Sequence, residues 1–192
     1  MKESLLFFFN FIRHPKSTGA VFPSSRRLAE VMVEDAGLDT AATVVELGPG
    51  TGAFTGTIAE RLGDQDNYLG LELREKFVSI VQEKYPHLRV VNDSAEKIVE
   101  NLGKIDRQKA DAIISGLPWA AFDADLQKRI MKSVTAALAP GGTFSTFTYL
   151  HARQLPAGKR FRALLDDNFS DVQTSKTVWL NLPPAFVYHC TK

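Results

Sequence analysis

The sequence predicts an α/β fold, in which a seven-stranded, mostly parallel sheet ends in an antiparallel hairpin and carries helices on both faces. Short apolar runs alternate with amphipathic helical stretches, a pattern typical of a parallel sheet covered on both sides. The last two apolar runs lie too close together for a helical crossover and should pair antiparallel. A chain of 192 residues, 44% of them hydrophobic, suits one well-buried domain.

The expected elements follow one another along the chain with clear punctuation. The five parallel strands are expected at 43–48, 68–73, 88–92, 111–117 and 142–150. The helices are expected at 24–36, 52–63, 74–85, 94–102, 123–138 and 158–167. Gly37, Gly63 and Gly103 stand near three helix ends, where glycine is a common stop. The hairpin strands are expected near 172–180 and 185–191, joined by NLPP as a turn.

The charge and the cysteine content exclude several classes of function. A formal net charge of +1 leaves no chain-wide basic field of the kind that captures nucleic acid, so we expect no nucleic-acid partner. Cys190 is the only cysteine, so an intramolecular disulfide is impossible and no cysteine cluster can hold a metal. We therefore expect no metal and a reducing, cytoplasmic location.

The stretch VVELGPGTGAFT, residues 44–55, places a glycine turn between the first strand and a helix. In an open α/β sheet such a turn lies at the edge where ligands bind. The lysine that a phosphate-binding loop requires is missing, and the spacing G-x-G-x-G differs from the G-x-G-x-x-G of dinucleotide sites. The alternative is a purely structural turn from strand to helix.

Acidic residues end the next two strands, where a nucleoside would need acceptors. Glu72 follows Gly52 by 20 residues, a position from which a carboxylate accepts hydrogen bonds from both ribose hydroxyls. Asp93 is placed to accept from an adenine amino group, with Ser94 and Ala95 after it. The alternatives are a surface acid for Glu72 and a helix N-cap for Ser94.

These motifs resemble the class I S-adenosylmethionine-dependent methyltransferases over residues 43–192, with VELGPGTG as the most specific element. The resemblance implies a Rossmann-like class I methyltransferase fold, S-adenosyl-L-methionine as the cofactor, and Glu46 near the methionine amino group. The cofactor-binding residues that it implies are Thr18, Glu46, Gly48, Gly50, Gly52, Glu72, Leu73, Asp93, Ser94, Ala95 and Ser115.

The fourth strand ends in SGLPW, residues 115–119, which resembles the N-L-P-Y motif of amine methyltransferases, above all the rRNA adenine dimethyltransferases. There an Asn or Asp and the carbonyls around the proline accept from the target nitrogen, and the aromatic residue packs on the acceptor. Ser115 stands in place of that Asn or Asp. A planar amine needs firm acceptors and an aliphatic amine does not, so the departure favours an aliphatic amine. An RNA adenine N6-methyltransferase without its accessory module is the alternative.

Both ends of the chain narrow the expected substrate further. FIRHPKSTGAVFPSS, SGLPW and TVWLNLPPAFVYHC together resemble the bacterial phospholipid N-methyltransferases, which convert phosphatidylethanolamine stepwise to phosphatidylcholine. The segment HPKSTGAVFPSSRRLA resembles the N-terminal segment that closes over the cofactor in the adenine dimethyltransferases. The catalytic and acceptor-pocket residues implied are Ser115, Leu117, Trp119 and Tyr149. Candidates for the headgroup phosphate are Tyr149, His151, Arg153, Lys159 and Asn181, each of which has a solvated loop residue as its alternative.

Residues 3–14 form an amphipathic helix if drawn as one, with Glu3, Asn10, Arg13 and His14 on a narrow polar face. The apolar stretch is shorter than the roughly 20 residues that span a bilayer, so we expect it to lie in the membrane interface. Packing on the enzyme's own core or on a partner subunit is the alternative. We thus expect residues 1–23 to form a membrane-interface helix and cofactor-covering segment, and residues 24–192 the methyltransferase domain. The expected location is the inner face of a membrane, with an anionic membrane surface as the expected partner. A cofactor-binding or assembly protein that has lost catalysis is the remaining alternative.

Overall fold

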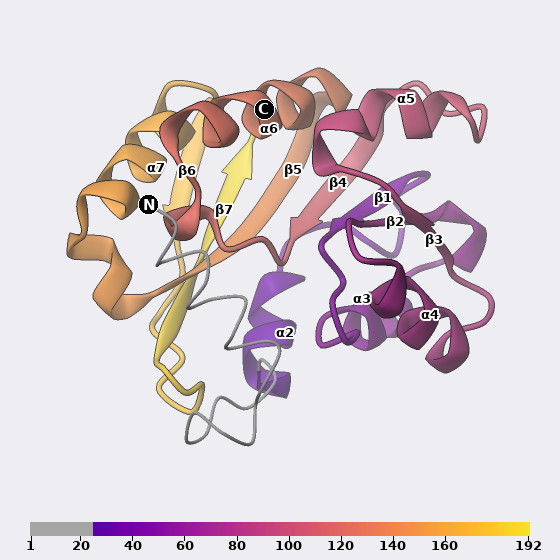
Figure 1. The fold of residues 1–192 in the computed structure, drawn as a ribbon, viewed down its shortest axis with the longest axis horizontal. Helices are drawn as coiled ribbons and strands as arrows, with labels where there is room; N and C mark the ends of the chain where they lie inside the picture. The colour runs from indigo at the N-terminus through magenta and orange to yellow at the C-terminus, as the bar shows by residue number, and fades with distance from the viewer. Residues whose placement is uncertain (1–24) are drawn as a thin grey trace.

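The structure is a computed structural model that describes residues 25–192 (Figure 1). The expectations for the interfacial helix, for the division at residues 23 and 24, and for Thr18 as a cofactor contact lie outside the described residues. Residues 25–192 contain all of the strands and helices expected for the methyltransferase domain; only position 24, the first residue of the helix expected at 24–36, lies outside them.

One seven-stranded sheet organises the fold, with the strand order β3-β2-β1-β4-β5-β7-β6. Strands β1 to β5 pair in parallel, and β7 runs antiparallel between β5 and β6. The predicted fold class is confirmed, including the antiparallel end. The strands are β1 (Val44–Leu47), β2 (Tyr68–Glu72), β3 (Arg89–Asn92), β4 (Ala110–Ser115), β5 (Leu138–Tyr149), β6 (Asp171–Thr174) and β7 (Ala185–Thr191).

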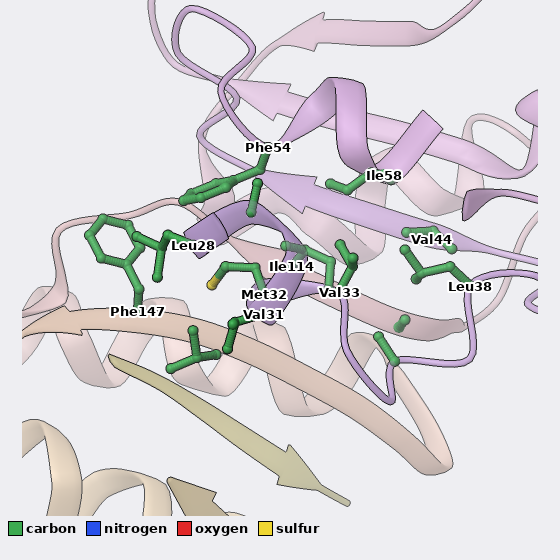
Figure 2. Close-up of a cluster of buried hydrophobic side chains, with 14 of the residues drawn as sticks. Leu28, Val31, Met32, Val33, Leu38, Val44, Phe54, Ile58, Ile114 and Phe147 are labelled. Carbon is green, nitrogen blue, oxygen red and sulfur yellow. The ribbon is translucent and has the colours of Figure 1, made fainter. Parts of the chain in front are cut away.

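Helices cover both faces of this sheet because successive strand residues point to opposite sides. Val44 of β1 packs with α2, α3 and α4 on one face, whereas Val45 packs with α5, α6 and α7 on the other. Figure 2 shows the first of these cores, where Leu28 and Met32 of α2 lie near Ile114 of β4. The helices are α2 (Arg26–Met32), α3 (Thr55–Arg61), α4 (Glu75–Lys84), α5 (Ile98–Gly103), α6 (Ala124–Ala137) and α7 (Pro156–Asp166).

Several element boundaries differ from the predicted ones. The sixth strand ends at Thr174 rather than at 180, and a ten-residue connection from Ser175 to Pro184 leads into β7. The helix expected at 94–102 begins as a 3-10 turn over Ala95–Lys97. Strand β5 begins at Leu138, before the predicted residue 142, because Leu138 already pairs with Ala110.

The described helices are short. The longest, α6, has 14 residues, whereas a helix that crosses a bilayer needs about 20. Within residues 25–192, no helix combines the length and the apolar character that crossing a membrane requires.

Candidate functional site

The predicted motifs of the described chain meet at one edge of the sheet. Leu47, the last residue of β1, pairs with both Leu71 of β2 and Ser115 of β4. Since β1 to β5 run parallel, the residues that follow these strands lie together at their carboxyl ends, where open α/β sheets bind ligands. The groups gathered there are the glycine turn, Glu72, Asp93, the loop 115–119 and Tyr149.

The glycine turn needs glycine for two different reasons. Gly48, Gly50 and Gly52 have φ angles of 69°, 59° and 83°, a region that side chains rarely adopt. A Cβ built at Gly48 would lie 2.8 Å from the Cδ2 atom of Leu117, so the turn packs tightly on the loop after β4. A Cβ built at Gly50 finds no described atom nearer than the Gly48 carbonyl oxygen, at 4.0 Å. Among the described residues, the space beside the Gly50 Cα atom therefore leaves room for a ligand.

Glu72 fastens this turn to the end of β2. One of its carboxylate oxygens accepts from the Gly50 amide at 3.0 Å, and the other accepts from the Arg74 amide at 2.9 Å. The side chain is buried, which argues against the alternative of a surface acid. Each carboxylate oxygen has a second lone pair. Glu72 can therefore hold the turn and still accept from a ligand, and its ribose role stays a prediction.

Glu46 is a fully buried carboxyl group beneath the turn. Its Oε2 atom accepts from the Thr55 hydroxyl at 2.8 Å and from the Tyr68 hydroxyl at 2.5 Å. Among the described residues its Oε1 atom has no hydrogen-bond partner. Burial raises the pKa of Glu46 to about 7, and the two hydroxyls offset only part of that rise. A buried acceptor without a partner is the arrangement that a cationic donor on a ligand would satisfy.

Tyr68 and Thr55 are partners of Glu46 that the sequence analysis did not identify. A signal for Tyr68 exists in the sequence, because Gly70 interrupts an otherwise bulky buried strand. A Cβ built at Gly70 would lie 2.8 Å from the Tyr68 hydroxyl oxygen. Glu46 pairs with Gly70 across the strands, so the missing side chain leaves room for the phenol to reach the carboxylate.

Asp93 lies in a small polar network after β3. Its carboxylate accepts from the Asn101 amide at 3.0 Å and from the Ser94 backbone N–H at 2.8 Å, and these two bonds lower its pKa. Lys97 lies 3.3 Å away. The Ser94 hydroxyl accepts from the Glu96 amide, as an N-cap does. Asn101, which the sequence analysis did not identify, thus holds the acid predicted to meet adenine; that contact stays a prediction.

Two neighbouring residues of the predicted cofactor set differ in exposure. Ala95 is half-buried and packs against the core on the α5–α7 face. Leu73, the residue after β2, is largely exposed at the same edge as Glu72. The contacts of these two residues do not show whether either one binds the cofactor, so both assignments stay predictions.

The loop after β4 is built around Ser115 and Trp119. The buried Ser115 hydroxyl oxygen accepts from the Trp119 indole N–H at 3.0 Å and from the Leu117 amide at 3.4 Å. The indole is 1% exposed and stacks on Phe161, with 4.7 Å between the ring centroids. Leu117 is half-buried against the glycine turn. In this structure Ser115 and Trp119 therefore shape the loop from within, while their roles toward an acceptor stay predictions.

We expect Ser115→Ala to lower the free energy of unfolding by about 1–3 kcal/mol, because the buried Trp119 N–H loses its acceptor. Urea unfolding at a fixed pH measures the change. Ser79→Ala removes an exposed hydroxyl that donates to the Glu75 carbonyl and serves as the control. In a Trp119→Phe background the Ser115→Ala effect should shrink, and an undiminished effect there would contradict the proposed bond.

The residues predicted to bind a headgroup phosphate lie near the end of β5. Tyr149 is half-buried and stacks on the exposed His151, with 5.8 Å between the ring centroids. Burial raises the pKa of Tyr149, so it remains a neutral phenol that can donate. The Arg153 guanidinium lies 5.8 Å from the centre of the Phe186 ring. Lys159 is exposed on α7.

Asn181 differs from the other phosphate candidates because its amide is already engaged. Its Oδ1 atom accepts from the Ser25 backbone N–H at 3.0 Å, and its Nδ2 atom donates to the Pro183 carbonyl at 2.7 Å. The side chain is buried. Asn181 thus ties the β6–β7 connection to the start of α2, and its predicted contact with a phosphate stays a prediction.

Comparisons with known proteins agree with this geometry. A family model described as a methyltransferase domain matches residues 44–142, more than half of the chain. An ornithine lipid N-methyltransferase from Singulisphaera acidiphila is 33% identical over 195 residues, which cover 99% of this chain and 96% of that protein. A ribosomal RNA small subunit methyltransferase A from Alkaliphilus oremlandii is 29% identical over 126 residues, 62% of this chain but 42% of that protein.

A solved structure shares the fold. The N-methyltransferase NodS from Bradyrhizobium japonicum, in complex with S-adenosylhomocysteine, superposes with a TM-score of 0.63 at 12% identity and covers 87% of this chain and 84% of its own. The cofactor is S-adenosylmethionine, and the residues here fit it: the open backbone at Gly50, the acceptor Glu72, and the unpartnered Oε1 atom of Glu46. This chain belongs to the family of S-adenosylmethionine-dependent methyltransferases.

Proposed function

We propose that the protein methylates the amine of a membrane lipid, with phosphatidylethanolamine and its methylated derivatives as substrates on the way to phosphatidylcholine. The observation that carries the proposal is the state of Ser115, whose hydroxyl is buried and accepts from Trp119. A planar base amine needs a strong side-chain acceptor at this position. An aliphatic amine, once deprotonated, is nucleophilic without one.

The relatives support a lipid amine over RNA. The similarity to the ornithine lipid N-methyltransferase runs through almost the full length of both proteins, whereas the similarity to the ribosomal RNA enzyme covers less than half of that enzyme. Ornithine lipid is therefore the second candidate substrate. Both lipids offer an aliphatic amine for methyl transfer, but only phosphatidylethanolamine carries the headgroup phosphate that the residues near Tyr149 are proposed to bind.

The proposed chemistry needs binding and orientation more than acid–base groups. When bound, S-adenosylmethionine supplies a methyl group on a positively charged sulfur. The sulfur leaves as a neutral thioether, so transfer of the methyl group needs no metal. Glu46, the glycine turn and Glu72 would hold the cofactor at the carboxyl edge. Tyr149, as a neutral phenol, would donate to the headgroup phosphate. His151, exposed beside it, or the lipid phosphate or water would take the proton from the amine. Holding the amine in line and excluding water supply most of the rate.

The membrane is the partner that we propose for this reaction, from the cytoplasmic side. The apolar residues 5–12 and the flanking basic residues support binding in the headgroup region, where each nearby cation contributes about 1 kcal/mol. Deletion of residues 1–14 should weaken vesicle binding, measured by sedimentation. Unchanged vesicle binding would contradict the interfacial helix.

The substrate is tested with S-adenosylmethionine that carries a labelled methyl group. Vesicles that contain phosphatidylethanolamine, vesicles that contain ornithine lipid, and ribosomal RNA are incubated with the protein in parallel. We expect label in lipid and none in RNA. Label in ornithine lipid alone would keep the lipid acceptor and replace phosphatidylethanolamine, and label in RNA alone would overturn the proposed function.

A further inference from the structure

The connection between β6 and β7, residues 175–184, exposes large apolar side chains in a way that the chemistry described above does not use. We call it the apolar loop. Trp179 is 68% exposed, Leu180 is 83% exposed and Leu182 is 53% exposed. Six large hydrophobic residues are markedly exposed among residues 25–192, and three of them lie within the four-residue stretch 179–182. Such a concentration marks an interaction surface rather than scattered surface residues.

The loop is held in this conformation by hydrogen bonds at its base. Val178 donates to the Ala185 carbonyl at 2.7 Å, and Leu150 donates to the Pro184 carbonyl at 2.9 Å. The polar Asn181 is buried between the exposed apolar residues, with its amide bonded to Ser25 and Pro183. Within residues 179–182 the polar side chain thus faces inward and the large apolar side chains face outward, the reverse of an ordinary surface loop.

The apolar loop also lies at the edge of the sheet that carries the site. Ala185, the first residue of β7, pairs with Tyr149, the last residue of β5. The loop therefore leaves the sheet beside the carboxyl end of β5, where Tyr149 and His151 lie. Leu155, another exposed apolar residue, follows the 3-10 turn Leu150–Gln154 at this end.

Two segments at this edge, the apolar loop and the stretch after β5, carry charge of one sign. Residues 149–165 and 175–184 contain lysine and arginine but no aspartate or glutamate. Lys176 lies in the loop and is exposed, and Arg153 lies over Phe186, next to the start of β7. Tryptophan and leucine flanked by cations are the side chains that enter the interface of an anionic bilayer.

We propose that the apolar loop inserts Trp179, Leu180 and Leu182 into the interfacial region of an anionic membrane. The inference rests on the proposed function, because a membrane held at this edge presents a lipid headgroup to Tyr149 and the glycine turn. It adds a docking surface in the folded domain, separate from the amphipathic segment at residues 3–14. The lipid need not leave the bilayer completely to reach the site.

Tryptophan fluorescence tests the insertion directly. The chain has two tryptophans, so Trp119→Phe leaves Trp179 as the only one in an otherwise full chain. We expect its emission to shift to shorter wavelength when vesicles of phosphatidylcholine and phosphatidylglycerol are added, and to be quenched by brominated acyl chains. This signal reports on the loop even where the N-terminal segment also binds. Emission that stays unchanged while the protein sediments with the vesicles would overturn the proposal.

A paired substitution provides an independent test that does not require changing Trp119. We expect Trp179→Ala with Leu180→Ser to weaken sedimentation with these vesicles about tenfold or more, since large apolar side chains no longer enter the interface. Val99→Ser removes an exposed apolar side chain on α5 and should leave binding unchanged. Equal binding by wild type and the paired variant would contradict the proposal.

The vesicles used for binding contain no primary-amine lipid, so the two proposals can fail separately. Insertion of Trp179 without methylation of any lipid would overturn the proposed function and leave the docking surface standing. With a monomeric short-chain phosphatidylethanolamine, the paired variant should methylate as fast as wild type, and with vesicles about tenfold more slowly. Equal rates on vesicles would overturn the docking surface and leave the proposed function standing.

Discussion

Replacing Gly116 with alanine is expected to lower kcat/KM for methyl transfer about a hundredfold while the protein still folds. A Cβ built at Gly116 would lie 2.8 Å from the carbonyl oxygen of Gly48, and real Cβ atoms essentially never come so close to a backbone atom. The Gly116 amide also donates to the Leu47 carbonyl at 2.8 Å, so a movement of the loop strains this hydrogen bond. The added methyl group must push the loop after β4 away from the glycine turn.

The displacement matters because those two segments carry opposite sides of the reaction. We expect the glycine turn to hold the methyl donor and the loop with Ser115 and Leu117 to border the acceptor. A shift of about 1 Å between reacting groups can lower a rate by about two orders of magnitude. Affinity for S-adenosylhomocysteine should fall less, because Glu72 lies at the end of β2, on the opposite side of β1 from the loop after β4.

The matched control is Gly103→Ala at the end of α5. A Cβ built there meets no described atom within 4 Å, and Gly103 is not among the residues with positive φ. The control should keep wild-type activity. Steady-state kinetics on the labelled lipid, calorimetry with S-adenosylhomocysteine and urea unfolding measure the three quantities. Wild-type kcat/KM in Gly116→Ala would show that the close contact does not set the spacing of the site.

The glycine turn was predictable because its chemistry is local. A strand, three glycines with fixed spacing and a helix specify the backbone conformation almost alone, and all three glycines adopt the positive φ that the spacing suggests. Gly116 was harder to interpret. Its requirement for glycine comes from Gly48, which is distant in sequence and becomes its neighbour only once β1 and β4 pair. The same holds for Tyr68, which reaches Glu46 across Gly70.

The end of the sheet shows a different limit of sequence interpretation. The apolar residues after 172 predicted a strand to 180, yet β6 ends at Thr174. An apolar pattern indicates which side chains are usually buried, but it does not show whether this particular fold buries them. Trp179 and Leu180 are apolar and exposed, so the pattern gave a strand where the chain forms the apolar loop. NLPP was expected to be a compact turn; the buried Asn181 amide instead organises a longer connection.

The second large effect that we expect is a dependence of stability on pH carried by Glu46. Burial raises the pKa of this carboxyl from 4.5 to about 7 in the folded protein. The folded state therefore binds the proton more tightly than the unfolded state does. Between these two values the free energy of unfolding falls as the pH rises, by about 3 kcal/mol in total. This stabilising contribution is fully present below the pKa of Glu46 in the unfolded chain. It is lost as the pH rises through the pKa of Glu46 in the folded protein.

Glu46→Gln should remove this dependence, because a glutamine stays neutral and can still bond to the hydroxyls of Thr55 and Tyr68. The variant should be more stable than wild type at pH 8, and the difference should shrink as the pH falls toward 5. Urea unfolding of both proteins across that range, without ligand, measures it. Glu100→Gln, which changes an exposed carboxylate paired with Lys104 on the surface, serves as the control and should show no such trend.

The same carboxyl group links the pH to cofactor binding. We expect the unpartnered Oε1 atom of Glu46 to accept from the amino group of S-adenosylmethionine, a bond that favours the ionised form. Affinity for S-adenosylhomocysteine should then fall with decreasing pH, by about tenfold per unit below the pKa of about 7. Glu46→Gln should bind more weakly and with little dependence on pH over the same range. If the stability difference between wild type and variant stayed constant from pH 5 to 8, Glu46 would be ionised in the folded protein, and the buried neutral acid would be excluded.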